Sequence, residues 1–184
     1  MFEEKWIVYF QKPGLVNTEM TLDLARKRAN ELGIRVVIVT STHGLTAQKA
    51  LDKFKNTGLQ LIVVGTAPKF FSEDILRSLK NEGIPIIFAG EVEYSYPELM
   101  RNALKKISEG MKVCLEVGMV AADQGLIQEG EEVIVIAGTS SRGFENGGGA
   151  DTAIVLKARS SKTFTNIPVK AQRREILEII CKPR

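Results

Sequence analysis

The chain has 184 residues, of which 44% are hydrophobic and 26% are charged, and its formal net charge at pH 7 is +3. These values are typical of a globular protein with a sizeable core, and the interspersed charges do not indicate a broad nucleic-acid-binding face. No stretch approaches the roughly 18 apolar residues of a membrane span, and the N-terminal residues do not resemble a signal peptide. We therefore expect a cytoplasmic protein with no nucleic-acid or membrane partner, and a homo-oligomer stays open.

The two cysteines, Cys114 and Cys181, lie far apart in the sequence, and each has apolar neighbours. This context predicts two buried free thiols in a reducing compartment. The chain contains one histidine, His43, so clustered metal ligands are missing from the sequence. No metal site is expected.

Strand and helix patterns alternate along most of the chain. Short apolar or β-branched runs bounded by turn residues predict strands at residues 6–10, 35–40, 59–64, 84–88, 132–137 and 151–156. Five stretches with apolar residues three or four positions apart predict helices. The first helix is bounded by Asn17, Thr18 and Gly33, the second ends at Gly58, the third begins at Ser72, the fourth begins at Pro97, and the fifth spans residues 112–126.

This alternation predicts an α/β fold, a three-layer α/β/α sandwich around a mostly parallel sheet. Residues 132–137 and 151–156 are joined by a loop with no room for a helix, so these two strands should be antiparallel neighbours in a mixed sheet. Residues 175–183 fit a helix or a strand equally well by pattern. Because no linker or repeat divides the chain, residues 1–184 are interpreted as a single domain.

The loop after the second strand is the clearest candidate for a binding site. A β-branched run ends there in hydroxyl side chains and a glycine, and an Ala-rich helical pattern follows. Helix N-termini carry unpaired N–H groups and a partial positive charge, which suits a phosphate. The same residue types are also the preferred caps of an ordinary strand–loop–helix joint, so both interpretations stay open. The candidate residues are Thr40, Ser41, Thr42, Gly44 and Thr46.

His43 lies inside that loop, where its ring could contact a ligand phosphate or stack on a ligand ring. It has no evident Asp or Cys partner, so a catalytic role is the less favoured interpretation. Neither of the nucleotide-binding fingerprints G-x-x-x-x-G-K-[ST] and G-x-G-x-x-G occurs in the chain.

A second candidate loop follows the strand at residues 132–137. Its glycines permit close backbone approach, and its arginine and hydroxyls suit phosphate oxygens, although a solvated hairpin loop would contain the same residue types. Because ligands gather at the carboxyl ends of parallel strands, the two loops should share one rim with residues 12–14, residues 65–67 and Gly90. The candidates in the second loop are Gly138, Thr139, Ser140, Ser141 and Arg142.

Several blocks of the chain resemble a known family. They are IVYFQKPG, TSTHGLTA, KVCLEVGMVAADQGLI, GADTAIVL and EIICKPR. Together they are similar to the C-terminal α/β domain of pyruvate kinase and, more closely, to stand-alone proteins of the pyruvate kinase alpha/beta domain family. The resemblance implies that fold, and it favours a strand for the last segment.

The resemblance also implies a ligand. The stand-alone relatives look like flavin mononucleotide (FMN) binders, whereas in pyruvate kinase the corresponding loops hold the phosphates of a sugar bisphosphate effector. Carried over by resemblance, the first loop contacts the phosphate and the second forms the opposing wall, with Lys12 and Gly14 nearby. Pyruvate kinase activity is not expected, because a chain of 184 residues leaves no room for the catalytic barrel.

Three functions follow from these expectations. The first is binding of a phosphorylated small molecule, with FMN as the preferred ligand. The alternatives are a flavin-dependent oxidoreductase and a sugar-phosphate-binding regulatory module that acts through a partner protein, so whether the chain is an enzyme stays open. Glu116 and Asp123 are seven residues apart and share one face of the fifth helix, but no role is assigned to them.

Overall fold

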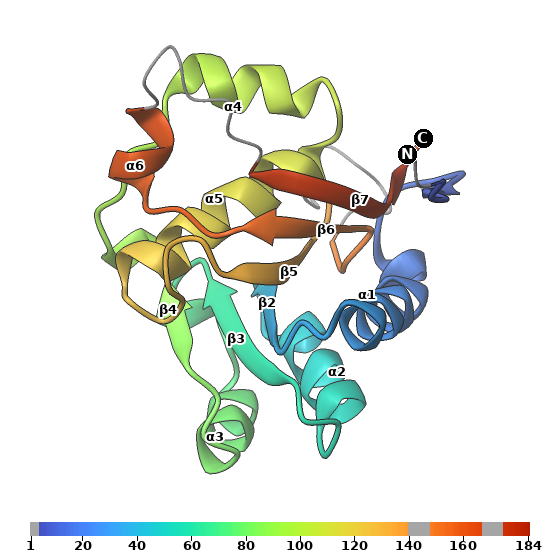
Figure 1. Ribbon diagram of the computed structural model, residues 1–184. Helices are drawn as coiled ribbons and strands as arrows, with labels where there is room; N and C mark the ends of the chain where they lie inside the picture. The colour runs from blue at the N-terminus through green and yellow to red at the C-terminus, as the bar shows by residue number, and fades with distance from the viewer. Residues whose placement is uncertain (1–3, 140–147, 167–174) are drawn as a thin grey trace.

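Within residues 4–139, 148–166 and 175–184, which a computed structural model of the chain describes, seven strands form one sheet (Figure 1). The strand order is β1-β7-β6-β5-β2-β3-β4. The strands are β1 (Val8–Phe10), β2 (Val36–Ser41), β3 (Gln60–Gly65), β4 (Ile86–Phe88), β5 (Glu132–Ala137), β6 (Thr152–Lys157) and β7 (Ile176–Pro183).

The sheet is mixed and mostly parallel, as predicted. β2 pairs in parallel with both β3 and β5, and the pairs β3–β4 and β1–β7 are also parallel. The predicted antiparallel pair is confirmed by β5 and β6, and β6 is also antiparallel to β7. The last segment is thus a strand, as the resemblance favoured. Pro85 comes directly before β4, which lies at one edge of the sheet, where a missing N–H is tolerated.

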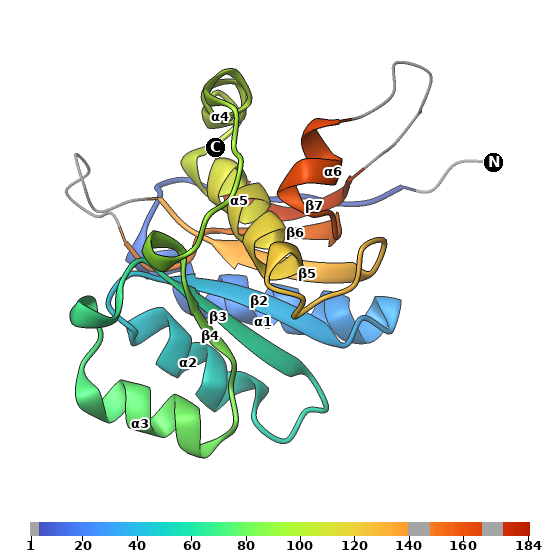
Figure 2. The ribbon, with the colours of Figure 1, turned by 90° about the vertical axis from the view of Figure 1, so that its left-hand side faces the viewer.

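The helices cover both faces of the sheet and complete the three layers (Figure 2). On one face α1 (Thr18–Leu32), α2 (Leu45–Phe54) and α3 (Glu73–Asn81) pack over a core that includes Leu22, Ala47 and Leu79. On the other face lie α4 (Glu98–Lys105), α5 (Glu109–Asp123) and α6 (Ser161–Thr165), over a core that includes Cys114 and Val120. Three short 3₁₀ turns, η1 (Leu15–Asn17), η2 (Pro68–Phe70) and η3 (Ala89–Glu91), lie in the connections between these elements.

Several helix boundaries differ from those predicted by pattern. α5 begins at Glu109 rather than at residue 112, because the Ser108 hydroxyl caps it by accepting a hydrogen bond from the Met111 N–H at 3.0 Å. α2 ends at Phe54 rather than at Gly58, since Lys55 already leaves the helical conformation with a ψ of 134° and Asn56 follows with a positive φ of 62°. The short helix α6 is not evident in the sequence pattern. Gly33 and Ser72 bound their helices as expected.

Both thiols are buried and free, as predicted. Burial raises the pKa of the Cys181 thiol to about 12 and also raises the pKa of Cys114. At neutral pH both side chains are therefore protonated and act as small apolar groups in the core.

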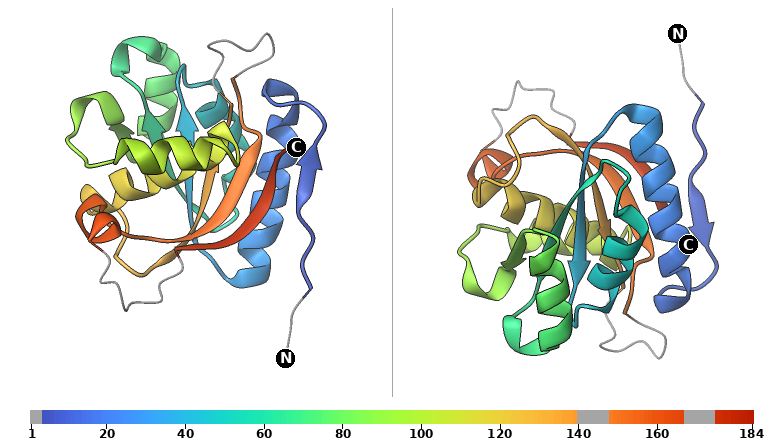
Figure 3. Two further views of the ribbon diagram at one scale, coloured as in Figure 1. Left: turned by 90° about the horizontal axis from the view of Figure 1, so that it is seen from above. Right: turned by 90° about the horizontal axis from the view of Figure 1, so that it is seen from below.

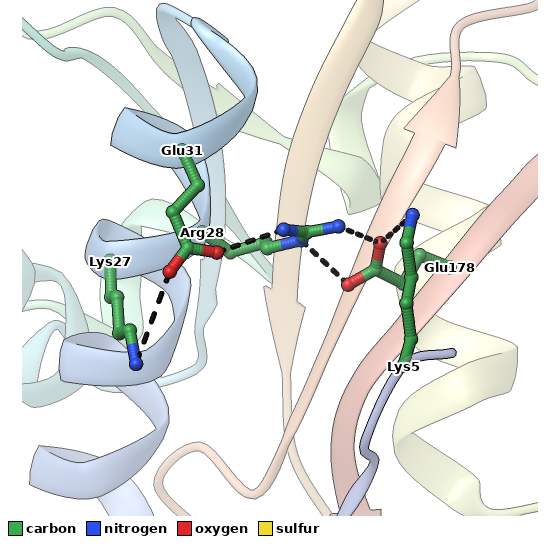
Figure 4. Close-up of polar contacts among 5 residues, drawn as sticks. All are labelled: Lys5, Lys27, Arg28, Glu31 and Glu178. Atoms are coloured by element: carbon green, nitrogen blue, oxygen red, sulfur yellow. Dashed lines mark hydrogen bonds and ion pairs between the residues drawn. The ribbon is translucent and has the colours of Figure 1, made fainter. Parts of the chain in front are cut away.

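A partly buried ion pair fixes α1 to β7 (Figure 4). The Arg28 guanidinium donates two hydrogen bonds to the two carboxylate oxygens of Glu178, at 2.8 and 2.7 Å, and a third to Glu31 at 2.8 Å. Lys5 donates to Glu178 at 3.0 Å from the segment before β1. The cluster therefore joins the start of the chain, α1 and the last strand. Burial alone would raise the pKa of Glu178, but the bonds from Arg28 and Lys5 hold it below its ordinary value.

Replacing Glu178→Gln should lower the free energy of unfolding at pH 7 by about 1–3 kcal/mol, because Arg28 loses a charged bidentate partner. Since the folded pKa of Glu178 is lowered, its contribution is complete above the unfolded value of about 4.3 and disappears as the pH falls through the folded pKa. In urea denaturation, the free energy of unfolding of Glu178→Gln should differ strongly from that of wild type at pH 7. At pH 3 the difference should be small. The control Glu31→Gln, at the exposed end of the cluster, should stay within about 0.5 kcal/mol. A Glu178→Gln effect that does not change with pH would contradict this role.

Candidate functional site

The candidate loops meet at one edge of the sheet because their strands are parallel neighbours. β2 and β5 are in register from Val37 opposite Ile134 to Val39 opposite Ile136, so the loops that follow these two strands leave the sheet side by side. On the other flank Ser41 lies opposite Gly65 of β3. We call this edge the rim. It is formed by the carboxyl ends of β2, β3, β4 and β5 and by the start of β6.

The N-terminus of α2 lies at the rim without a side-chain cap. Gly44 precedes the helix with a φ of 86°, no side chain caps the first turn, and that turn contains no acidic residue. Ser41 and Thr46 are buried, and Thr42 and His43 are exposed. Among the described residues, no hydrogen-bond partner is found for the hydroxyls of Thr40, Ser41, Thr42 and Thr46. The loop therefore presents both unpaired hydroxyls and the N–H groups of a helix start.

The neighbouring helices at the rim each have an acidic residue in the first turn, and α3 also has a side-chain cap. At α1 the Thr18 hydroxyl accepts a hydrogen bond from the Ala150 N–H at 3.0 Å, and Glu19 lies in the first turn. At α3 the Ser72 hydroxyl caps the Ile75 N–H, and Glu73 and Asp74 follow. Acidic residues in the first turn offset the positive end of a helix dipole. α2 has neither a side-chain cap nor such an acid.

A glycine is required at position 44 by both backbone conformation and packing. A Cβ on Gly44 would lie 2.9 Å from Cγ2 of Ile75 and 3.0 Å from Cδ1 of Phe71, two side chains from the region of α3. The positive φ is also unfavourable for any residue with a Cβ. The chain therefore turns sharply at Gly44, and the N-terminus of α2 faces the rim.

The second loop is anchored by a residue that sequence reasoning did not select, Asp151. Its carboxylate is fully buried, and Oδ2 accepts the N–H of Gly14 at 2.9 Å and the N–H of Thr139 at 3.1 Å. Oδ1 accepts the Thr152 hydroxyl at 2.9 Å. Asp151 thus ties the connection after β1 to the loop after β5. The sequence did contain a signal for this role. Asp151 directly precedes a run of apolar residues, and a buried charge without partners would be costly there.

The described ends of the second loop are packed too tightly for side chains. A Cβ on Gly138 would lie 2.1 Å from the Gly149 carbonyl oxygen, and a Cβ on Gly149 would lie 2.4 Å from the Thr18 hydroxyl. Gly138 therefore has a packing role, whatever its role toward a ligand. Ser140, Ser141 and Arg142, predicted as parts of the opposing wall, lie outside the described residues.

Aromatic and basic side chains lie next to the start of α2. The His43 and Phe70 rings meet edge to face with centroids 5.9 Å apart, and the Lys69 ammonium lies 5.3 Å from the centre of the Phe70 ring. Phe70 is 38% exposed, so part of its ring is free to contact a ligand. Lys12 is exposed, and its carbonyl oxygen accepts a hydrogen bond from the Asn17 amide at 2.7 Å.

The comparisons with known proteins agree with this architecture. A family model described as the pyruvate kinase alpha/beta domain matches residues 19–156. The chain belongs to this family. Among solved structures it is similar to a Cryptosporidium parvum pyruvate kinase in complex with ADP, with 19% identity and a TM-score of 0.46 over 82% of this chain and 25% of that chain. A second C. parvum pyruvate kinase structure matches with 19% identity and a TM-score of 0.45 over 80% and 24% of the two chains.

This alpha/beta domain therefore spans about a quarter of the length of the two pyruvate kinases. In the described part of the chain, no helix is long and apolar enough to cross a membrane. No group of three or more His, Cys, Asp or Glu side chains that could hold a metal ion is found among the described residues.

In this domain Glu116 and Asp123 make structural contacts. Glu116 accepts a hydrogen bond from the Tyr94 hydroxyl and lies 3.5 Å from the Lys112 ammonium. Burial, together with this hydrogen bond, raises the pKa of Tyr94 to about 12. Asp123 accepts the N–H of Ser161 at 2.9 Å, at the start of α6. The two carboxylates attach different segments to α5.

Replacing Asp151→Ala should lower the free energy of unfolding by about 2–4 kcal/mol, because two buried backbone N–H groups lose their acceptor. The isosteric Asp151→Asn keeps one oxygen for those N–H groups and should cost less than half as much. Chemical denaturation of the three proteins measures both values. Equal losses for the two variants would indicate that the negative charge, rather than hydrogen-bond acceptance, is what the rim requires.

Proposed function

We propose that this domain binds a phosphorylated small molecule at the rim, with its phosphate at the N-terminus of α2, and that FMN is the ligand. The observation that carries this proposal is the open start of α2, which has a left-handed glycine, no side-chain cap and no acid in its first turn. Backbone N–H groups at such a position point at a bound anion, and the helix dipole favours negative charge there.

The hydroxyls of this loop extend the same argument. Thr40 and Ser41 come from the end of β2, and Thr46 comes from the first turn of α2, so they flank the connection that leads into the helix. Among the described residues these hydroxyls have no other partner, and each can donate to a phosphate oxygen. A phosphate bound there would satisfy several donors at once and would not have to displace an existing hydrogen bond.

The His43–Phe70 pair favours a ligand with a planar ring over a simple sugar phosphate. Edge-to-face aromatic pairs leave ring surface available for a further aromatic group, and Lys69 adds a positive charge beside it. A flavin has both features, a phosphate at one end and a large flat ring at the other. The opposing wall would come from Gly138 and Thr139, and Asp151 holds the backbone N–H of Thr139 in place.

Bound FMN would supply hydride chemistry, and the protein would contribute binding and orientation. The described residues supply no assigned catalytic group, so binding is the function proposed and catalysis is left to experiment. An absorption spectrum of the freshly purified protein, with mass spectrometry of any released compound, is the direct test. Substrate-dependent reduction or reoxidation of bound flavin would extend the function to an oxidoreductase.

Replacing Thr46→Val should weaken FMN binding roughly tenfold, because one hydroxyl donor to the phosphate is lost with little change in shape. The matched control is Ser72→Ala at the start of α3. It should lower thermal stability but leave the dissociation constant for FMN unchanged. Titration of the apoprotein followed by flavin fluorescence measures both constants. Equal affinities of Thr46→Val and wild type for FMN would show that the phosphate does not bind at the N-terminus of α2.

The proposed contact between the Phe70 ring and the flavin is tested by comparing two ligands, FMN and ribose 5-phosphate. Phe70→Ala should weaken binding of FMN but not of ribose 5-phosphate, which has no aromatic ring to stack. Shifts of the melting temperature report both ligands, since a ligand that binds the folded state stabilises it. If ribose 5-phosphate or a sugar bisphosphate stabilises the protein and FMN does not, the site is a sugar-phosphate site and the flavin proposal fails.

A further inference from the structure

Residues 91–106, which lead from the end of η3 through α4, lie on the outer side of α5. Figures 1 and 2 show α5 between α4 and the sheet, and in the view from above α4 lies over α5 (Figure 3, left). α4 contains no buried residue, and Leu99 on it is 84% exposed. Within residues 91–106 Tyr96 is the only buried residue. We call this segment the strap.

The backbone of the strap is not bonded to the layers beneath it. Among the described residues, no backbone–backbone hydrogen bond joins the strap to the sheet or to α5. The chain is held on either side of the strap, because the Gly90 N–H donates to the Thr66 carbonyl at 3.0 Å and the Lys182 ammonium donates to the Ile107 carbonyl at 3.3 Å. The strap is therefore a segment with two fixed ends, and its middle is attached through side chains.

The polar side chains that attach the strap converge on one end of α5. The Tyr94 hydroxyl donates to Oε1 of Glu116, and Nη2 of Arg101 lies 3.9 Å from the same oxygen. The Tyr96 hydroxyl donates to the Lys112 carbonyl at 2.9 Å. Burial raises the pKa of both tyrosines, that of Tyr94 to about 12, so both hydroxyls keep the proton that they donate at neutral pH. Glu116 therefore receives two of these three contacts.

The remaining attachment of the strap is limited. Val92, Tyr94 and Leu104 pack against the core on the α5 face but are only partly buried. The Nε of Arg101 is buried without a hydrogen-bond partner among the described residues, which costs free energy in the closed position. Few buried apolar contacts and an exposed helix are the properties of a unit that opens at a lower free energy than the whole fold.

We propose that the strap opens from α5 as one unit while the sheet and the other helices stay folded, and that Glu116 is the residue that holds it closed. Opening would turn the apolar side chains of Val92, Tyr94 and Leu104 to solvent. The protein would then have a second conformation with an additional apolar surface beside α5. The proposal involves no residue of the phosphate loop, so it does not depend on FMN binding.

Trypsin sites and thiols of the chain itself separate local opening from global unfolding. Arg101, Lys105 and Lys106 lie in the strap, and a protease cuts a helix only after it unfolds locally. Cys114 and Cys181 are both 0% exposed, so a thiol reagent reaches them only when the core opens. Each native rate, divided by the rate for the unfolded chain, gives an open fraction.

For wild type, the open fraction of the strap should exceed that of the thiols at least about tenfold. Mass spectrometry of the fragments shows whether the cuts lie within the strap. Equal open fractions for the strap and the thiols would show that the strap opens only with the whole fold, and the proposal would be wrong.

Two variants test the role of Glu116. Glu116→Gln should raise the open fractions of the strap and of the thiols by the same factor, roughly tenfold, because its contacts are lost in both kinds of opening. The control Glu178→Gln breaks the ion pair between α1 and β7, which strap opening leaves intact. It should raise the open fraction of the thiols but not that of the strap. Faster cutting of the strap in Glu178→Gln, or unchanged cutting in Glu116→Gln, would overturn the proposal.

Discussion

The central constraint on this molecule is the burial of β2 and β5 between two helical layers. Both strands are covered on both faces, so their backbone groups can be satisfied only by neighbouring strands. Parallel pairing of β2 with β3 and β5 meets this need and requires each crossover to pass over a face of the sheet. One consequence is that the carboxyl ends of these strands all face the same way. The rim thus follows from the parallel pairing of the buried strands and does not depend on which residues lie at the rim.

The residues at the rim divide into those that complete the fold and those that remain available. Asp151, Thr18 and Ser72 each satisfy backbone N–H groups, and Gly138 and Gly149 allow segments to touch. Ser72 caps the start of α3, and Thr18 joins the start of α1 to the segment before β6. The start of α2 is left with donors that the described protein does not use. The residues at the start of α2 are therefore the ones at the rim whose hydrogen-bonding groups are available to a ligand.

The sequence was sufficient for the layers and most strands, because buried parallel strands read as β-branched runs and glycines or caps separate them. It placed residues 132–137 as a strand with the bounds the structure shows. It was insufficient where several segments share one partner. Asp151 binds backbone from two segments far apart in the chain, and no local pattern reveals such a contact. The end of α2 was missed because Lys55 and Asn56 leave the helical conformation although the pattern of apolar residues continues past them. The ring pair of His43 and Phe70 depends on the β3–α3 connection, whose path the sequence leaves undetermined.

The position of β7 has a consequence for how the chain is assembled. β7 lies between β6 and β1, so among the described strands the first to be synthesised pairs with the last. Val8 lies opposite Cys181, which means that residues 8–10 have no sheet partner while the ribosome is still translating the middle of the chain. Contacts at such a sequence separation form slowly, because a long loop must close before they stabilise anything. During synthesis β1 therefore waits longer for a sheet partner than any other described strand, and its apolar residues stay open to chaperone binding for that time.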